Sequence, residues 1–386
     1  DQRPRLLMRG ASNAYFAQVV SALSIPESDS QLVEVVREHM DVLTNADASN
    51  LATLRIAIPK LKALGDASDA EVLEAVAVLK NPGESERPPL RTAEFEQFMS
   101  QPDYRTGVLP APEDKFFARR YVSPVGLPTG IGDVILASKL REVSVQVGFT
   151  RLEPPSADLQ GEYDLGVGHC RLGLNTRWLP ASEIWGEGVF LQLEEKAVQA
   201  WENRPEVLER GKLLEAAHRL WAGDKEGAMP FPGVRFYLLH SLSHLLINAI
   251  AIECGYSAAA LSERIYCAPR NDEVPMAAIL ISTGTPGSEG TLGGLVEQGK
   301  QILEHLQRSY DMGRLCSNDP VCASHDPSND PTRRYQEGAA CHGCLYVAEP
   351  SCERFNRYLD RALVVPTMGH PREIAFFTER PSVEGK

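Results

Sequence analysis

The chain has 386 residues, which at roughly 150 residues per domain predicts two or three domains. Its composition, with 43% hydrophobic and 24% charged residues, is that of a globular protein and excludes a disordered, collagenous or low-complexity chain. The 52 acidic and 39 basic side chains give a net charge of −13, which excludes nucleic-acid binding by bulk electrostatic attraction, so DNA contact would need a local basic groove or a basic partner.

The predicted elements are mostly helical. In chain order, the residue pattern predicts an extended segment over residues 1–26, helices over 31–43, 50–64, 68–79 and 93–99, a basic helical connector over 113–150, a strand over 183–193, helices over 194–202, 205–222, 233–254 and 257–267, a strand over 277–283, a helix reaching residue 310 and a helix over 352–362. We therefore expect a mixed α/β, helix-rich, multi-domain fold. Its parts would be a mostly helical N-terminal region with proline-rich linkers over 1–112, a central α/β domain over 113–310 and a cysteine-rich module with a tail over 311–386.

No segment resembles a membrane span or an export signal. The longest apolar run, residues 245–252, is shorter than the approximately 20 residues that cross a bilayer. The first residues, Asp1-Gln2-Arg3-Pro4, are not followed by the apolar stretch of a signal peptide. We expect a cytoplasmic protein whose cysteines stay reduced and serve a metal rather than disulfides.

The strongest local signal is a cluster of cysteines: Cys316, Cys322, Cys341, Cys344 and Cys352. Zinc favours four thiolates in a tetrahedron, and a Cys-x2-Cys turn supplies two of them, with Gly343 giving the turn its backbone freedom. Cys352 precedes a helical pattern, where a helix N-terminus would favour its thiolate. Five cysteines compete for four places, so one of them is spare or supporting. A closed four-cysteine site leaves no position for water, which predicts a structural Zn²⁺.

Two histidines lie four residues apart on a strongly apolar helix. His240 and His244 would face the same side, and they allow a metal pair with Glu253 or Cys254 nearby. The glutamate that follows the first histidine in zinc proteases is missing, so histidines bonded to backbone in a core or interface are favoured. A metal-dependent nuclease or hydrolase that uses His240 and His244 remains the alternative function.

A glycine-rich segment comes close to a phosphate-binding loop. Gly294-x4-Gly299-Lys300 lacks the Ser or Thr that would coordinate magnesium, so no ATPase is predicted from it. The loop over 284–294 lies between a strand and a helix and is the better candidate for a phosphate contact, although a tight turn is favoured there.

Several strings of residues resemble the DrmB proteins of the DISARM phage-defence system. They are residues 9–16 (RGASNAYF), 21–26 (SALSIP), 139–143 (KLREV), 148–151 (GFTR), 178–180 (WLP), 186–192 (GEGVFLQ), 255–257 (GYS), 262–266 (SERIY), 284–296 (GTPGSEGTLGGLV), 341–345 (CHGCL), 351–353 (SCE) and 356–361 (NRYLDR). The C-terminal half also resembles the helicase-associated, zinc-binding domain that is fused to some bacterial DNA helicases.

This resemblance implies an antiviral role without catalysis by the chain itself. It implies an accessory subunit that pairs with a separate superfamily-two helicase, DrmA, which is the ATPase, and helps it to engage foreign DNA. It also implies that Cys341, Cys344 and Cys352 ligate zinc, and less firmly Cys316 and Cys322. A free-standing DNA-binding regulator is a third possibility, which the net charge of −13 disfavours.

Overall fold

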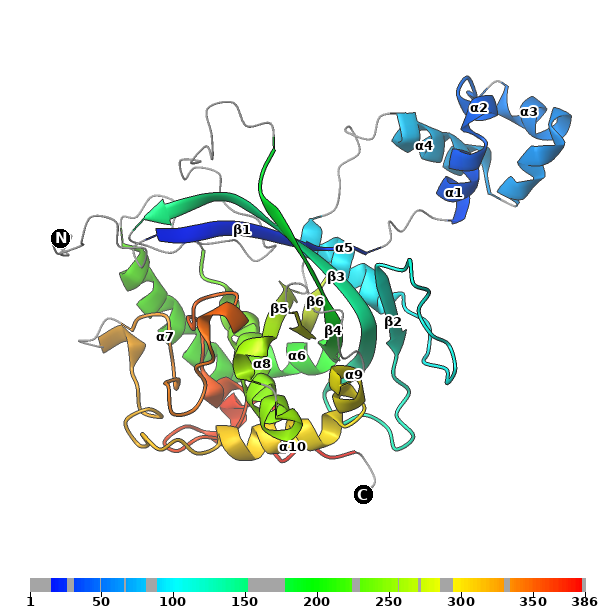
Figure 1. The fold of residues 1–386 in the computed structure, drawn as a ribbon. Coiled ribbons are helices and arrows are strands. Elements are labelled where there is room, and N and C mark those ends of the chain that lie inside the picture. Colours follow the sequence, from blue (N-terminus) through cyan, green and yellow to red (C-terminus); the bar gives the residue numbers. More distant parts are fainter. Residues whose placement is uncertain are drawn as a thin grey trace. The chain divides into compact units, whose positions relative to one another are not determined.

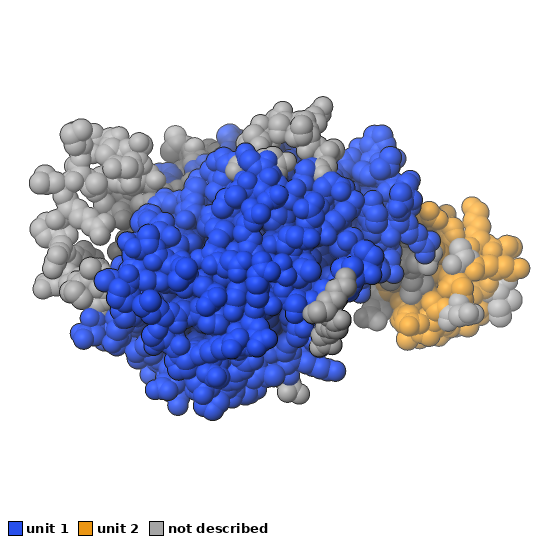
Figure 2. Space-filling model, turned by 90° about the horizontal axis from the view of Figure 1, so that it is seen from below, with its two compact units in different colours: residues 1–24, 90–386 blue, residues 25–89 orange. Residues whose placement is uncertain are grey.

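The computed structural model describes residues 15–25, 31–48, 50–65, 67–80, 89–151, 178–223, 230–255, 257–269, 272–284, 294–329 and 334–383 (Figure 1). The chain forms two compact units, which Figure 2 colours separately: unit 1 takes residues 1–24 and 90–386, and unit 2 takes residues 25–89. The boundaries predicted from the sequence, at residues 112 and 310, both fall inside unit 1, and that three-part division stays a prediction.

Unit 2 is a small helical body. Its elements are α1 (Gln31–Glu38), α2 (Met40–Leu43), α3 (Leu51–Ala57), η2 (Pro59–Leu64) and α4 (Asp69–Lys80). Val36, Leu43, Leu51 and Val72 are fully buried in a core of its own, as the predicted helical spacing of apolar residues requires.

Unit 1 is built on an antiparallel sheet of six strands. The strands are β1 (Tyr15–Leu23), β2 (Phe116–Arg120), β3 (Ile131–Arg151), β4 (Ala181–Leu193), β5 (Leu261–Ala268) and β6 (Met276–Thr283). Their order is β1-β3-β4-β6-β5, and β2 pairs separately with β3. The long β3 pairs with three other strands and curls with them over the helices (Figure 1).

The helices of unit 1 cover both faces of this sheet. They are α5 (Leu90–Met99), α6 (Glu195–Glu202), α7 (Pro205–Ala222), α8 (Gly233–Cys254), α9 (Gly294–Gly299) and α10 (Ile302–Gly313). Val189 of β4 and Ile279 of β6 share one core with α8, whereas Phe190 of β4 stacks on Phe98 of α5, with 4.6 Å between ring centroids. Adjacent strand residues therefore point to opposite, buried faces.

A buried ion pair fastens α5 to the sheet. Glu94 has no exposed side-chain surface, and its Oε1 lies 2.6 Å from the Arg264 guanidinium of β5. The same carboxylate accepts hydrogen bonds from the Leu23 backbone N–H of β1 and the Tyr266 hydroxyl. Burial alone would raise the pKa of Glu94, but the charges of Arg264 and Arg91 outweigh it and hold the pKa below its usual value.

Helix α8 is long and apolar enough to cross a membrane by length and composition, and 83% of its most hydrophobic window is buried. Such a helix is weak support for a membrane span, because the core helix of a globular protein passes the same test. Most side chains of α8 are buried, and they form a large part of the hydrophobic core of unit 1.

Three of the predicted elements are wrong. Residues 113–150 form β2 and most of β3 rather than a helical connector, and the alternation of Val143, Val145 and Val147 has the period of a strand. Residues 261–268 form β5, because Gly255 ends α8 in a left-handed conformation and an edge position is open beside β6. Residues 352–360 form turns and irregular chain that lead into the short η6 (Arg361–Leu363), with positive φ at Phe355, Asn356 and Tyr358.

Candidate metal centres

Four of the five predicted cysteines meet in unit 1. Cys316 and Cys322 lie in the loop after α10, and Cys341 and Cys344 lie in the Cys-x2-Cys turn. All four sulfurs lie within 4.8 Å of one another, with Sγ–Sγ distances of 3.4 Å (316–341), 3.7 Å (322–344) and 3.8 Å (341–344). A zinc tetrahedron with Zn–S bonds of about 2.3 Å has edges of about 3.8 Å, so these residues fit a structural zinc. We name them the tetracysteine cluster.

Amide groups of the two loops point at the sulfurs. Cys316 Sγ accepts a hydrogen bond from the Asn318 backbone N–H at 3.4 Å, and Cys341 Sγ accepts one from the Gly343 N–H at 3.3 Å. A Cβ atom at Gly343 would lie 2.8 Å from Ser317 Oγ and 3.3 Å from Cys316 Sγ. The turn therefore requires glycine because the two loops approach closely, whereas its φ is not in the left-handed region that the sequence argument implied.

One thiol of this cluster, that of Cys322, loses its proton readily. Hydrogen bonding with Cys344, together with the nearby Arg361 charge and against the opposing effect of burial, lowers the pKa of the Cys322 thiol to about 5. The same contact raises the pKa of Cys344, because the pair shares one proton. Thiolate is the form that binds zinc, so the first proton is lost readily and the metal would displace the others.

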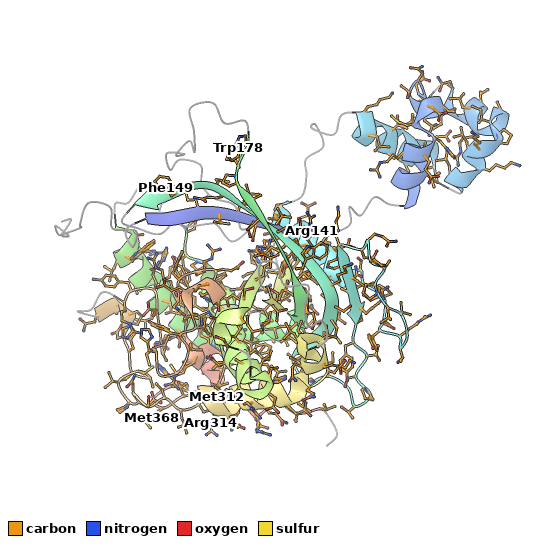
Figure 3. All side chains as sticks on the ribbon, viewed as in Figure 1. Arg141, Phe149, Trp178, Met312, Arg314 and Met368 are labelled. Carbon is orange, nitrogen blue, oxygen red and sulfur yellow. The ribbon has the colours of Figure 1, made fainter. Side chains whose placement is uncertain are left out.

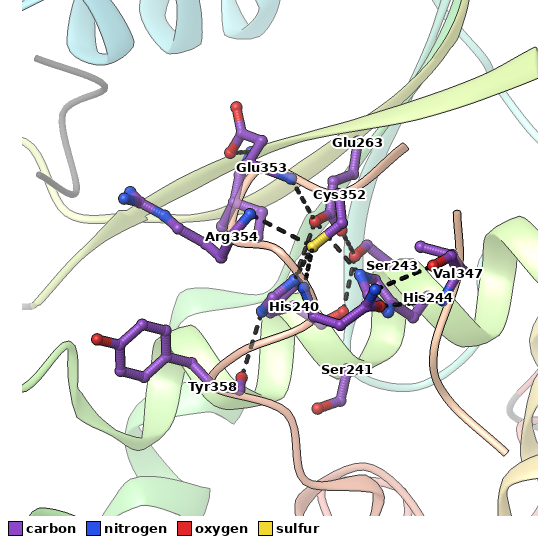
Figure 4. Close-up of polar contacts among 12 residues, drawn as sticks. His240, Ser241, Ser243, His244, Glu263, Val347, Cys352, Glu353, Arg354 and Tyr358 are labelled. Atoms are coloured by element: carbon purple, nitrogen blue, oxygen red, sulfur yellow. Dashed lines mark hydrogen bonds and ion pairs between the residues drawn. The ribbon is translucent and has the colours of Figure 1, made fainter. Parts of the chain in front are cut away.

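Cys352 does not join the tetracysteine cluster. It lies with His240, His244 and Glu263, and one ligand atom from each of these residues lies within 4.8 Å of the others (Figure 4). We name these four residues the mixed cluster. The resemblance implied Cys352 as a zinc ligand more firmly than Cys316 and Cys322, and the geometry reverses this order, because it separates Cys352 from the other four. It follows the short helix η5 (Glu349–Ser351) and precedes turns, not the predicted helix.

The two predicted histidines face the same side of α8, but their carboxylate and thiol neighbours are not the expected ones. Glu253 forms a surface ion pair with Arg308 at 2.7 Å, and Cys254 lies half-buried at the end of α8. The carboxylate beside the histidines is Glu263. No local pattern could have identified it, because only the packing of β5 against α8 brings it there.

Burial and charge act in opposite directions in the mixed cluster. Burial lowers the pKa of His240 despite the nearby Glu263 carboxylate. Burial would raise the pKa of Glu263, but the two histidines hold it well below the usual value. Glu263 is therefore ionised, as a metal ligand requires.

The near-Walker segment takes no part in either cluster. Gly299 ends α9 against Leu136 and Val189, where a Cβ atom would lie 2.4 Å from Leu136 Cδ2, so the glycine allows packing on the sheet. Lys300 is paired with Glu297 at 2.6 Å. Of the alternative loop over 284–294, residues 285–293 lie outside the described part of the chain.

Comparison with known proteins identifies the zinc-binding part of the chain. Residues 242–345 match the family described as MZB, the MrfA Zn-binding domain, and this segment contains all four residues of the tetracysteine cluster together with His244 and Glu263. The family match and the sulfur geometry agree on a structural zinc.

One curated relative and one solved structure are among the proteins to which the chain is similar. The DISARM protein DrmB of Bacillus paralicheniformis is 30% identical over 94% of this chain, and the chain spans 64% of the length of that relative. The crystal structure of the DUF1998 helicase MrfA bound to DNA shares 13% identity, covers 56% of this chain and 23% of its own, and has a TM-score of 0.25, a likeness too loose to carry an argument. The chain thus contains an MrfA Zn-binding domain and is similar to a DISARM DrmB protein over nearly its whole length, which confirms the resemblance inferred from its sequence.

Proposed function

We propose that the chain is a non-catalytic accessory subunit of an antiviral DISARM complex, where it binds the superfamily-two helicase DrmA and helps it to engage foreign DNA. The observation that carries this proposal is the similarity to DrmB over 94% of the chain. The tetracysteine cluster supports it, because four thiolates saturate zinc and such a site stabilises folding without activating water. Thiolate sites persist in a reducing compartment, so we keep the cytoplasm as the proposed location.

The zinc-binding region offers a surface for the helicase. Leu315 and Val321 directly precede Cys316 and Cys322, and their side chains are 72% and 77% exposed. Met368 is 56% exposed, and Figure 3 labels it with Arg314 at one edge of unit 1. Apolar side chains that protrude beside a rigid metal site suit a protein partner. The apolar helix α8, in contrast, is taken up by the core of unit 1.

In this proposal, DNA is bound by the complex of the chain with the helicase and not by the chain alone. Arg141 is a basic side chain on the curled sheet (Figure 3), but its guanidinium is paired with Glu183 at 2.8 Å. Arg120 is likewise paired with Asp133 at 3.2 Å. With a net charge of −13, the chain relies on the helicase for most of the positive charge that DNA binding needs.

Co-purification of this chain with its helicase, followed by an ATPase assay with and without DNA, tests the proposal. We expect a stable complex whose DNA-stimulated ATPase differs from that of the helicase alone. Val321→Ser should weaken the complex while zinc is retained, and Leu208→Ser, an exposed apolar residue on α7, should leave it intact. A chain that stays separate and leaves the ATPase unchanged would refute the accessory role and redirect attention to the His240/His244 hydrolase, tested by metal-dependent DNA cleavage.

A further inference from the structure

The orientation of both histidines in the mixed cluster is fixed by backbone carbonyls. His240 Nδ1 lies 3.3 Å from the Tyr358 carbonyl oxygen, and His244 Nδ1 lies 2.9 Å from the Leu345 carbonyl oxygen. A carbonyl only accepts hydrogen bonds, so each Nδ1 carries a proton, and each ring in its neutral form presents a lone pair at Nε2. This is the arrangement in which histidine binds metals through Nε2, with an outer carbonyl holding the tautomer.

The two Nε2 atoms converge on other acceptors. Glu263 Oε1 lies 2.9 Å from His240 Nε2 and 3.4 Å from His244 Nε2. Cys352 Sγ lies 3.2 Å from His240 Nε2. When both Nε2 atoms are unprotonated, these atoms and the carboxylate oxygen present electron pairs to the same point. A cation at the centre of the cluster would satisfy them.

Hydrogen-bond donors from outside the mixed cluster contact two of its proposed ligands. Cys352 Sγ accepts the Arg354 and Asn356 backbone N–H groups at 3.3 and 3.2 Å, contacts that would stabilise its thiolate on a metal. Glu263 accepts the Glu353 N–H at 3.1 Å and the Ser243 hydroxyl. The outer hydrogen bonds of the ligands are therefore supplied from outside the cluster, and a metal would displace the Cys352 thiol proton, which remains inside it.

Protonation of the histidines is the competing way to satisfy these contacts. One imidazolium would pair with Glu263 and leave the other Nε2 without a proton, and two would place like charges with ring centroids 4.5 Å apart, in side chains without any exposed surface. Two like charges in a desolvated site oppose each other strongly, whereas one divalent ion satisfies all four ligands together.

We propose that His240 Nε2, His244 Nε2, a Glu263 carboxylate oxygen and Cys352 Sγ bind a second divalent metal ion, separate from the tetracysteine cluster. Two imidazoles, one carboxylate and one thiolate in a four-coordinate arrangement suit zinc. All four positions are filled by the protein, so the ion is structural. It joins α8 and β5, which follow each other closely in the chain, to the turn after η5, which lies far from them in the sequence.

A route for the metal exists. A cavity of about 350 Å³ is lined by both Glu263 and Cys352, together with polar groups that include Ser262 and Glu353. The histidines lie behind these two ligands and are fully buried. An ion can thus enter past the carboxylate and thiolate without opening the core around α8.

The metal content of the purified full-length chain tests this inference on the unmodified protein. After incubation with Zn²⁺ and removal of excess metal, elemental analysis should find two zinc ions per chain. X-ray absorption at the zinc edge should find a mixture of sulfur with nitrogen and oxygen neighbours. One zinc ion per chain with sulfur neighbours alone would overturn the proposal, and this readout does not depend on whether any variant folds.

Variants then assign the second ion to its ligands. Glu263→Gln keeps the shape of the side chain and removes its charge, and Cys352→Ser replaces sulfur by oxygen; each should reduce the content from two ions to one. Cys254→Ser alters a cysteine outside both clusters and should retain two. Two zinc ions retained in both cluster variants would overturn the assignment.

Discussion

Arg361 and Asp319 form a buried ion pair beside the tetracysteine cluster, with 2.5 Å between Nη2 and Oδ1. The Asp319 carboxylate also accepts the backbone N–H of Cys316 at 2.9 Å, and Arg361 donates to the Gly313 carbonyl at 2.8 Å. One end of this pair therefore orients a zinc-ligating loop, and the other belongs to the C-terminal segment. Outer contacts of this kind position metal ligands and tune their affinity.

Replacement of this guanidinium should weaken zinc binding without touching a ligand. Arg361→Met leaves the Asp319 carboxylate buried without its partner, so we expect a loss of about 10- to 100-fold in zinc affinity, measured by competition with a chelator. Arg380→Met removes a guanidinium from an ion pair with Asp311 that is about half exposed, and should leave zinc affinity unchanged. Equal effects of the two substitutions would contradict a supporting role for Arg361.

Loss of a cluster cysteine should remove zinc and unfold its surroundings together. In Cys341→Ser we expect loss of the tetracysteine zinc, faster amide exchange over residues 314–347 and weaker helicase binding, because zinc binding contributes directly to folding. Cys254→Ser is the matched control, since this cysteine lies outside both clusters. A variant that loses zinc but keeps both its exchange protection and its helicase complex would show that the zinc does not support this surface.

The two clusters differ in how far the sequence predicted them. The Cys-x2-Cys turn is a local pattern, so Cys341 and Cys344 could be assigned without knowledge of the fold. The His240/His244 pair was also visible as a helix periodicity. Glu263 was not, because its position depends on the packing of β5 against α8, and the segment was interpreted as a helix. Cys352 was grouped with the nearest cysteines in the sequence, whereas tertiary contacts place it with the histidines.

The helices and strands also differ in how well the sequence predicted them. The two long helices α7 and α8 were predicted with the bounds that the structure shows. The 21-residue β3 was missed because its basic residues suggested a helical connector, although both its sides pair with other strands. Strand pairing is non-local, and the partners of β3 lie before and after it in the chain.

The Glu94–Arg264 ion pair should make unit 1 sensitive to acid. The pKa of Glu94 is lower in the folded chain than the value of about 4.3 in an unfolded chain, so its stabilising contribution is present above that pH and is lost as the pH falls through the folded pKa. Glu94→Gln should lower the free energy of unfolding at pH 7 by about 3–5 kcal/mol, because Arg264 would keep a buried charge without its partner. Urea unfolding at several pH values measures both effects.

Glu183→Gln provides the comparison for this experiment. Glu183 pairs with Arg141 but is 45% exposed, so water screens the interaction and the free energy of unfolding should change far less. If Glu94→Gln were as mild as Glu183→Gln, the buried carboxylate would not hold α5 to the sheet.

The close approach of the two zinc loops should make Gly343→Ala weaken the zinc site. The added Cβ of Gly343→Ala would meet Ser317 Oγ at 2.8 Å, and overpacking of this kind costs about 1–3 kcal/mol. Because the strain falls on the metal site, we expect a loss of about tenfold or more in zinc affinity by chelator competition. Removing the opposing oxygen in the double variant Gly343→Ala/Ser317→Ala should recover much of this loss, while Ser317→Ala alone should have little effect. Additive effects of the two substitutions would mean that Gly343 acts through its backbone conformation and not through contact between the loops.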